Sequence, residues 1–252
     1  RRPWTAAASN ILGGMPPPVV KYAIWGSNTG VGKTLVSAGL VRAAVQRLQL
    51  STLYLKPLQT GARDYDSDGH LVALCAGVRH RLGEHAAATP LSQLHGGLPC
   101  LEAGNSLART LFAWHDPVSP HVAVEREGRG VSDETLLRAT NDALSAFELD
   151  GGSIAFLETA GGVASPSSSG ALQCDVFGVL DLPAVLVGDS RLGGISTTIS
   201  AAESLERRNH ATPVVVLLDE GGLGNSSAIR AQLAPRGISV VELPALDVEL
   251  PS

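Results

Sequence analysis

The sequence predicts an α/β protein with a mostly parallel sheet and helices on both of its faces. Short aliphatic runs such as VVKYAIW and TPVVVLLDE alternate with longer segments of helical periodicity. Strands that alternate with helices pair in parallel through right-handed crossovers. The chain has 252 residues, of which 44% are hydrophobic, which is enough to fill one core. We therefore expect residues 19–252 to form a single domain.

In chain order, the predicted elements begin with a buried strand at residues 19–25 and a helix from Gly32 to about Leu48, whose apolar residues recur at helical spacing. A second strand, TLYLKP, is expected to end at Pro57. The segment SDGHLVALCAG predicts a helix that starts at Ser67 or Asp68 and ends before Gly77. Residues 78–130 contain several Pro and Gly and five of the seven histidines, so we expect them to be irregular.

The second half of the chain carries clearer signals. SDETLLRATNDALSAF predicts a helix with Ser132 as its N-cap and acidic residues in its first turn. SIAFLETAGG predicts a strand that runs into a glycine turn. The remaining expected elements are strands at 182–189, 212–220 and 238–243 and helices at 195–209 and 225–237.

Charge is unevenly distributed along the chain. The formal net charge is −5, yet residues 1–63 contain eight Lys or Arg and no acid. A basic segment favours a phosphate site, whereas the overall negative charge argues against a nucleic-acid-binding face. Residues 1–18, RRPWTAAASNILGGMPPP, fit the end of an organelle transit peptide and a disordered tail equally well. No apolar run reaches the roughly 18 residues of a membrane span, so we expect no membrane partner.

The segment GSNTGVGKT, residues 26–34, matches the pattern GxxxxGK[ST] of a phosphate-binding loop. It lies between a predicted strand and a predicted helix, where backbone N–H groups and the helix N-terminus can face phosphates. The alternative is a glycine-rich turn with an incidental lysine. The pattern and its placement predict a P-loop NTPase-like fold. The predicted nucleotide-binding residues are Gly26, Asn28, Thr29, Gly30, Val31, Gly32, Lys33 and Thr34.

Two charged residues end predicted strands. Lys56 ends the second strand and Glu158 ends IAFLE, and the carboxyl ends of parallel strands face the crevice in which ligands bind. Glu158 is therefore a candidate Mg²⁺ ligand, and Lys56 is a candidate for neutralising an anion during phosphoryl transfer. The alternatives are an exposed loop carboxylate and a surface lysine. Asp68 fits a metal ligand and a helix cap equally well.

Other residues carry less information. Arg191, in GDSRLGG after a predicted strand, fits a phosphate or substrate loop and a plain turn equally well. The cysteines Cys75, Cys100 and Cys174 form neither a CxxC pattern nor a disulfide framework, and we interpret them as buried apolar residues.

Six motifs together resemble the dethiobiotin synthetase family of biotin biosynthesis. They are GSNTGVGKT, LKPLQTG, SDGHLVAL, PVSPHVAVERE, ETAGGVASP and GDSRLGGIS, and they follow in the family's order across Val19 to Leu243. LFAWHDPVSPHVAVERE and ETAGGVASPSSSGALQCDV look most like the eukaryotic form, in which the synthetase is fused to diaminopelargonate aminotransferase and imported into mitochondria. The resemblance implies a mitochondrial homodimer. Without the import signal, the expected compartment is the cytoplasm.

The resemblance also implies a reaction. ATP, CO₂ and 7,8-diaminononanoate give dethiobiotin, ADP and phosphate through a phosphorylated carbamate. By the family's pattern, Lys56, Lys33 and Thr29 are catalytic, and Thr34, Asp68 and Glu158 hold Mg²⁺. The same pattern makes Thr60, Gly161, Gly162 and Ser196 substrate positions, partly across a dimer interface.

One departure from the family concerns the nucleotide base. Bacterial members usually carry an Asn after the late strand that reads the base, whereas this chain has Asp219 and Glu220. A carboxylate there would favour a guanine edge or relax the choice of base.

Three rival functions share the expected fold. A P-loop ATPase switch of the partitioning type usually has an extra lysine early in the loop, where this chain has Ser27 and Asn28. A cobyrinate-type synthetase needs an attached glutaminase domain, for which 252 residues leave no room. A catalytically dead module has no need of Lys33, Lys56, Asp68 and Glu158 together. We therefore expect a ligase.

Overall fold

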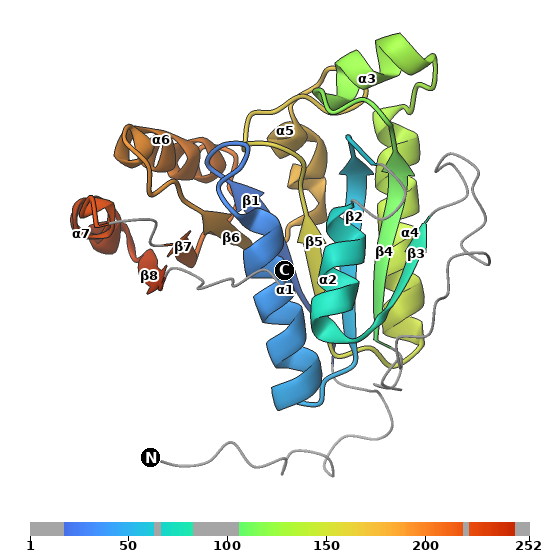
Figure 1. Cartoon of the computed structure of the whole chain (residues 1–252), viewed down its shortest axis with the longest axis horizontal. Helices are drawn as coiled ribbons and strands as arrows, with labels where there is room; N and C mark the ends of the chain where they lie inside the picture. Colours follow the sequence, from blue (N-terminus) through green and yellow to red (C-terminus); the bar gives the residue numbers. More distant parts are fainter. Residues whose placement is uncertain (1–17, 63–66, 83–105, 219–221, 245–252) are drawn as a thin grey trace, which may run out of the picture.

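An eight-stranded parallel sheet forms the centre of the computed structural model, which describes residues 18–62, 67–82, 106–218 and 222–244 (Figure 1). Within these residues the strand order is β3-β4-β2-β5-β1-β6-β7-β8, and every pair of neighbouring strands is parallel. The strands are β1 (Val20–Gly26), β2 (Thr52–Gln59), β3 (Arg79–Leu82), β4 (Leu107–Ala113), β5 (Ile154–Glu158), β6 (Ala184–Val187), β7 (Val214–Leu218) and β8 (Ser239–Leu243). The parallel sheet that the alternating pattern predicts is confirmed.

Helices cover both faces of this sheet, as predicted. The described helices are α1 (Lys33–Arg42), continued by the π-helical turn η1 (Ala43–Arg47), α2 (Asp68–Ala76), α3 (Pro120–Glu127), α4 (Asp133–Leu149), α5 (Gln173–Val176) with the 3₁₀ turn η3 (Phe177–Leu180), α6 (Gly194–Glu206) and α7 (Asn225–Leu233) with η4 (Ala234–Arg236). Apolar residues of α1 and α2 pack on one face, and those of α4, α5, α6 and α7 pack on the other. On β1, Ile24 faces the first layer while Ala23 and Trp25 face the second, because successive side chains alternate across a strand.

The order of the strands places the predicted phosphate loop at the crevice. β1 lies between β5 and β6, and the chain runs from β1 to β2 on one side but reaches β6 and β7 on the other. In open parallel sheets, ligands bind beyond the carboxyl ends of the strands at such a switch point. The loop after β1 and the carboxyl-terminal parts of β2 and β5 therefore lie beside one another on the same side of the sheet.

Several predicted helix boundaries are confirmed. Ser67 caps α2 by accepting a hydrogen bond from the His70 N–H, and Gly77 follows α2 in the left-handed conformation with φ 72°. Ser132 caps α4 by accepting from the Thr135 N–H. The first helix starts one residue later than predicted, at Lys33, and its last turn is π-helical. Among the described residues, no helix is long and apolar enough to cross a bilayer.

Two predictions about strands and loops are wrong. β2 does not end at Pro57 but continues to Gln59. Beyond Leu55, β2 pairs only with β4, and the register of that pairing passes from Lys56 to Leu58. The missing N–H of Pro57 therefore interrupts no pairing that these registers contain. The expected irregular stretch 78–130 contains β3, β4 and α3 in its described part. Residues 83–105 of that stretch, and residues 1–17 of the expected tail, lie outside the described residues.

Candidate active site

The loop after β1 wraps around the ammonium group of Lys33. Lys33 is buried at the start of α1, and its Nζ lies 3.5 Å from the Asn28 carbonyl oxygen. A Cβ added to Gly26 would meet that same oxygen at 2.8 Å and Lys33 Nζ at 2.9 Å. Glycine at this position therefore lets the backbone close around the lysine, as a phosphate-binding loop requires.

Gly30 and Gly32 both adopt left-handed backbone angles, with φ 71° and 89°, but their surroundings differ. A Cβ on Gly32 would collide with the Leu218 side chain, whereas a Cβ on Gly30 would meet nothing within 4 Å. We expect Gly30→Ala to cost only the strain of the left-handed conformation, about 1–2 kcal/mol. Gly32→Ala would in addition displace the loop. We therefore expect it to weaken ATP binding more than Gly30→Ala does, as measured by calorimetric titration of each variant with ATP. Equal affinities of the two variants would contradict this packing argument.

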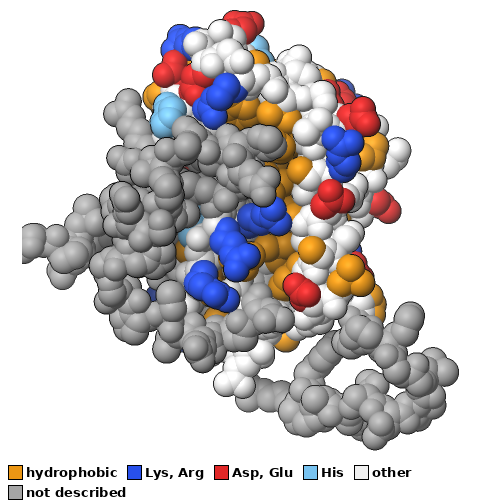
Figure 2. Space-filling view, turned by 90° about the vertical axis from the view of Figure 1, so that its right-hand side faces the viewer, with side chains coloured by type: hydrophobic (Ala, Val, Ile, Leu, Met, Phe, Trp, Pro, Cys, Tyr) orange, Lys and Arg blue, Asp and Glu red, His pale blue; other side chains and the backbone are white. Residues whose placement is uncertain are grey.

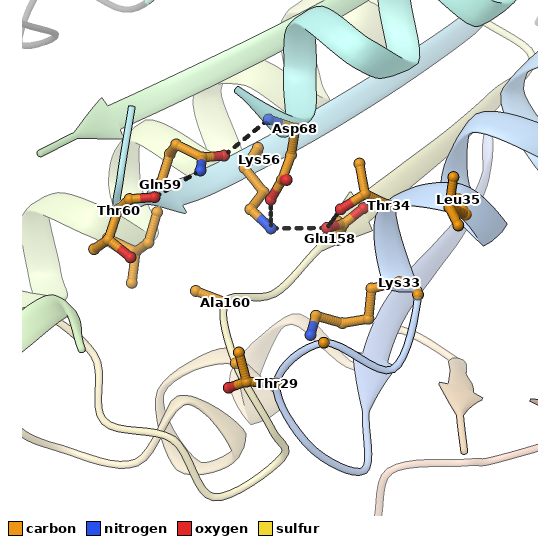
Figure 3. A pocket seen from close by; sticks show the side chains of 14 residues that line it. Thr29, Lys33, Thr34, Leu35, Lys56, Gln59, Thr60, Asp68, Glu158 and Ala160 are labelled. Atoms are coloured by element: carbon orange, nitrogen blue, oxygen red, sulfur yellow. Dashed lines mark hydrogen bonds and ion pairs between the residues drawn. The ribbon is translucent and has the colours of Figure 1, made fainter. Parts of the chain in front are cut away.

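A cluster of three charged residues lies opposite this loop, on β2, at the end of β5 and at the start of α2 (Figure 3). Lys56 Nζ lies 2.6 Å from Asp68 Oδ2 and 2.8 Å from Glu158 Oε1. The Lys56 side chain is 3% exposed, Glu158 is 0% exposed and Asp68 is 32% exposed. Lys56 also donates to the Thr159 carbonyl oxygen at 3.2 Å. Buried charges are tolerated only when they are paired in this way.

The protonation states of this cluster follow from burial and from the neighbouring charges. Burial and the Lys56 ammonium lower the pKa of Lys33 to about 8, although Glu158 and Asp68 act in the opposite direction. Burial also favours neutral Lys56, but the Glu158 and Asp68 carboxylates outweigh it and raise the pKa of Lys56. Burial favours neutral Asp68, yet Lys56 outweighs it and lowers the pKa of Asp68. Lys56 and Asp68 are therefore both charged at neutral pH.

The oxygens of Thr34, Asp68 and Glu158 fit a small divalent cation. Thr34 Oγ1 donates to Glu158 Oε1 at 3.1 Å, and Thr34, Asp68 and Glu158 line the same pocket. The ammonium of Lys56 already lies between the two carboxylates, so this position attracts a cation. The described residues contain no cluster of three or more His, Cys, Asp or Glu that forms a complete metal site. That is expected for Mg²⁺, which is usually held by one or two carboxylates and completed by phosphates and water.

The loop and the charge cluster line one pocket of about 410 Å³. Of the predicted site residues, Thr29, Gly30, Gly32, Lys33, Thr34, Lys56, Thr60, Asp68, Glu158 and Gly161 line it. Gly26, Asn28 and Val31 belong to the loop but do not line the pocket, and Gly162 packs against the backbone of Ser27 and Asn28. Ser196 is exposed on α6 and does not line the pocket either.

Three polar residues of the site are not predicted from the sequence. Gln59 joins two parts of the site, because its Oε1 accepts from the Asp68 N–H at 3.3 Å and its Nε2 donates to the Thr60 carbonyl oxygen at 2.9 Å. Ser37 and Tyr54 both donate to Glu158 Oε2, at 2.6 and 3.1 Å. Burial, together with Glu158, raises the pKa of Tyr54 well above its ordinary value, so its hydroxyl keeps its proton.

The loop that carries Arg191 is held in a turn by hydrogen bonds within the loop and from Asn225. Arg191 binds the Asp189 carboxylate through Nε at 2.9 Å and Nη2 at 2.8 Å, and the Arg191 N–H donates to the same carboxylate. Asn225 Nδ2 donates to the carbonyl oxygens of Asp189 and Arg191. Arg191 does not line the pocket, so the geometry favours the turn over the phosphate loop. Asp219 and Glu220, the predicted base-reading residues, lie outside the described residues.

A phosphate loop at the switch point of a parallel sheet, with a lysine and two carboxylates facing it, defines a P-loop nucleotide-binding protein. A family model described as "AAA domain" matches residues 21–95 and 100–232. A ParA family ATPase from Chlorobium tepidum has the same fold, with a TM-score of 0.54 and 11% identity over 91% of this chain and 85% of that one.

Curated relatives place the chain more narrowly. It is 32% identical to the ATP-dependent dethiobiotin synthetase BioD of Phenylobacterium zucineum, over 78% of this chain and 75% of the relative. It is 44% identical over 89% of its length to the mitochondrial bifunctional dethiobiotin synthetase/7,8-diamino-pelargonic acid aminotransferase of Oryza sativa. The chain spans about 30% of that longer relative. The chain belongs to the dethiobiotin synthetase family.

Proposed function

We propose that the chain is an ATP-dependent dethiobiotin synthetase, which closes 7,8-diaminononanoate and CO₂ into a cyclic urea in biotin biosynthesis. The observation that carries the proposal is the pocket in which Lys33 of the phosphate loop and the Lys56, Asp68 and Glu158 cluster face one another. A phosphate loop alone would serve any nucleotidase. A second buried lysine beside it suits a reaction that brings two anions together.

The proposed reaction has three steps. One amine of the diamine adds to CO₂ and loses a proton, which forms a carbamate. A carbamate oxygen then attacks the γ-phosphorus of ATP, and ADP leaves. The second amine finally attacks the carbamoyl carbon, phosphate leaves with the oxygen that had joined carbon to phosphorus, and the ring closes.

In this proposal two lysine ammonium groups neutralise different anions. Lys33 lies in the phosphate loop and binds the phosphates that are transferred and left behind. Lys56, on the opposite wall, stabilises the carbamate against the γ-phosphate, because these two anions would otherwise repel each other. Thr29, Thr60 and Gly161 line the same pocket and are proposed to contact the diamine or its carbamate.

Thr34, Asp68 and Glu158 are the residues that would hold Mg²⁺ beside the phosphates. Bound there, the ion would supply charge neutralisation of the β- and γ-phosphates. Their hydroxyl and carboxylate oxygens are the donor types that Mg²⁺ prefers. The surrounding hydrogen bonds keep these oxygens in place.

We further propose that the chain is the synthetase part of a bifunctional mitochondrial enzyme. The support is the 44% identity to the Oryza relative of that name and the acid-free segment at residues 1–18. A homodimer is proposed as well. The family's pattern makes Ser196 a substrate position, yet Ser196 is exposed and lies outside the pocket of its own chain. In such a dimer Ser196 and Gly162 would contact substrate near the interface.

The test is phosphate release by the purified chain with Mg²⁺-ATP and bicarbonate, with and without 7,8-diaminononanoate. We expect release only with the diamine, together with dethiobiotin identified by mass. ATP hydrolysis that is indifferent to the diamine would contradict the synthetase and support an ATPase switch.

A further inference from the structure

We propose that Ser37 and Tyr54 are positioning residues that hold the Glu158 carboxylate with its Oε1 turned toward the cation position. This inference rests on the proposed function, because it takes Thr34, Asp68 and Glu158 as the residues that hold a divalent cation. Neither Ser37 nor Tyr54 belongs to the phosphate-loop pattern. Both side chains are 0% exposed.

The two oxygens of Glu158 have separate sets of donors. Oε1 accepts from Thr34 Oγ1 at 3.1 Å and from Lys56 Nζ at 2.8 Å, and these two residues line the pocket. Oε2 accepts from Ser37 Oγ at 2.6 Å and from Tyr54 OH at 3.1 Å, and neither of these residues lines the pocket. The carboxylate thus has one oxygen that faces the chemistry and one that is bound behind it.

The spacing of the donors explains how two elements build this arrangement. α1 carries Thr34 and Ser37, which are three residues apart and so lie on one face of the helix. β2 carries Tyr54 and Lys56, which are two residues apart and so point to the same face of the sheet. Each element therefore supplies one donor to Oε1 and one to Oε2.

Binding of a divalent cation by Thr34, Asp68 and Glu158 would change only the pocket side of the Glu158 carboxylate. A cation held by Oε1 would compete with the ammonium of Lys56, which lies 2.8 Å from that oxygen in the structure. The two hydroxyl donors on Oε2 would not be affected by that exchange. They hold the plane of the carboxylate while its other oxygen changes partners. This role parallels that of hydrogen-bond partners that orient metal ligands, whose removal typically lowers metal affinity about 10–100-fold.

The experiment compares Tyr54→Phe, Ser37→Ala and the double variant with the unsubstituted chain. Mn²⁺ affinity in the presence of ADP is measured from the EPR signal of the free ion, at a temperature well below the melting point of each variant. We expect each single variant to bind Mn²⁺ about tenfold more weakly, and the double variant more weakly still. The affinity for ADP without metal should not change, because the phosphate loop is intact.

Tyr22→Phe is the matched control. Tyr22 lies on β1 of the same sheet and stacks on Phe156, but Tyr54, not Tyr22, is bonded to Glu158. We expect this control to bind Mn²⁺ like the unsubstituted chain. Unchanged Mn²⁺ affinity in both Tyr54→Phe and Ser37→Ala would overturn the proposal.

A crystal structure of the double variant, grown without metal, separates this inference from the proposed function. We expect the Glu158 carboxylate to be rotated, so that one oxygen no longer contacts both Thr34 and Lys56. An unrotated carboxylate would overturn the positioning role whatever the chain catalyses. If the unsubstituted chain binds no Mn²⁺ while the carboxylate rotates as expected, the metal assignment fails and the positioning of Glu158 stands.

Discussion

Replacing Lys56 with alanine is expected to lower the rate of dethiobiotin formation by about a thousandfold, the scale seen when one charge-stabilising donor is lost from a transition state. Lys56 Nζ is the buried positive charge between Asp68 and Glu158, on the wall of the pocket opposite Lys33. Without it, carbamate and γ-phosphate would meet with their repulsion uncompensated on that side. Single-turnover kinetics with saturating substrates would measure the loss in the chemical step.

The matched control for Lys56 is Lys21→Ala. Lys21 forms an exposed ion pair with Glu148 at 2.7 Å, neither residue lines the pocket, and such pairs contribute about 0–1 kcal/mol. We expect this control to keep its rate and its melting temperature. A Lys56→Ala rate within tenfold of the unsubstituted chain would remove Lys56 from the proposed chemistry.

Glu158→Gln is expected to lower both stability and metal binding, although glutamine has nearly the same shape. Four donors converge on the two carboxylate oxygens of Glu158, and an amide offers only one oxygen to accept from them. Whichever way the amide turns, its NH₂ group faces other donors. Loss of one member of a buried ion pair costs about 3–5 kcal/mol.

Thermal unfolding would measure this cost. For a domain of this size each kcal/mol corresponds to about 2–4 °C, so a fall of roughly 6–20 °C is expected. Glu148→Gln, on the exposed partner of Lys21, is the control and should leave the melting temperature unchanged. A stable Glu158→Gln variant that binds Mn²⁺ normally would contradict the assigned role of Glu158.

Most of the fold could be predicted because strands and helices alternate with strong local signals. Ser67, Gly77 and Ser132 mark helix ends through caps that depend only on neighbouring residues. β3 could not be predicted in the same way, because its sequence RHRL has no apolar alternation. This strand forms one edge of the sheet, on the side of the molecule that Figure 2 shows. α5 has four residues, which is too short for helical periodicity to appear.

The site could be predicted where a motif or a strand end marks a residue. Lys33 and Thr34 follow from the phosphate-loop pattern. Glu158 follows from its place at the end of β5, and Lys56 follows from a predicted strand end, although β2 continues three residues beyond it to Gln59. Ser37 and Tyr54 carry a weaker signal, since each is spaced to share a face with a predicted residue, Thr34 or Lys56. Gln59 carries none, because a glutamine at a strand end has many uses. Its contact with the Asp68 N–H depends on the tertiary fold.

The most direct test of the proposed chemistry follows an oxygen atom from CO₂ to phosphate. The purified chain is mixed briefly with ATP, 7,8-diaminononanoate and bicarbonate labelled with ¹⁸O, and the released phosphate is analysed by mass. The proposed phosphorylated carbamate predicts phosphate that carries one ¹⁸O from the labelled carbonate, formed together with dethiobiotin. Unlabelled phosphate from labelled bicarbonate, or phosphate that takes its oxygen from ¹⁸O-water, would mean that ATP is hydrolysed directly, and would contradict the account.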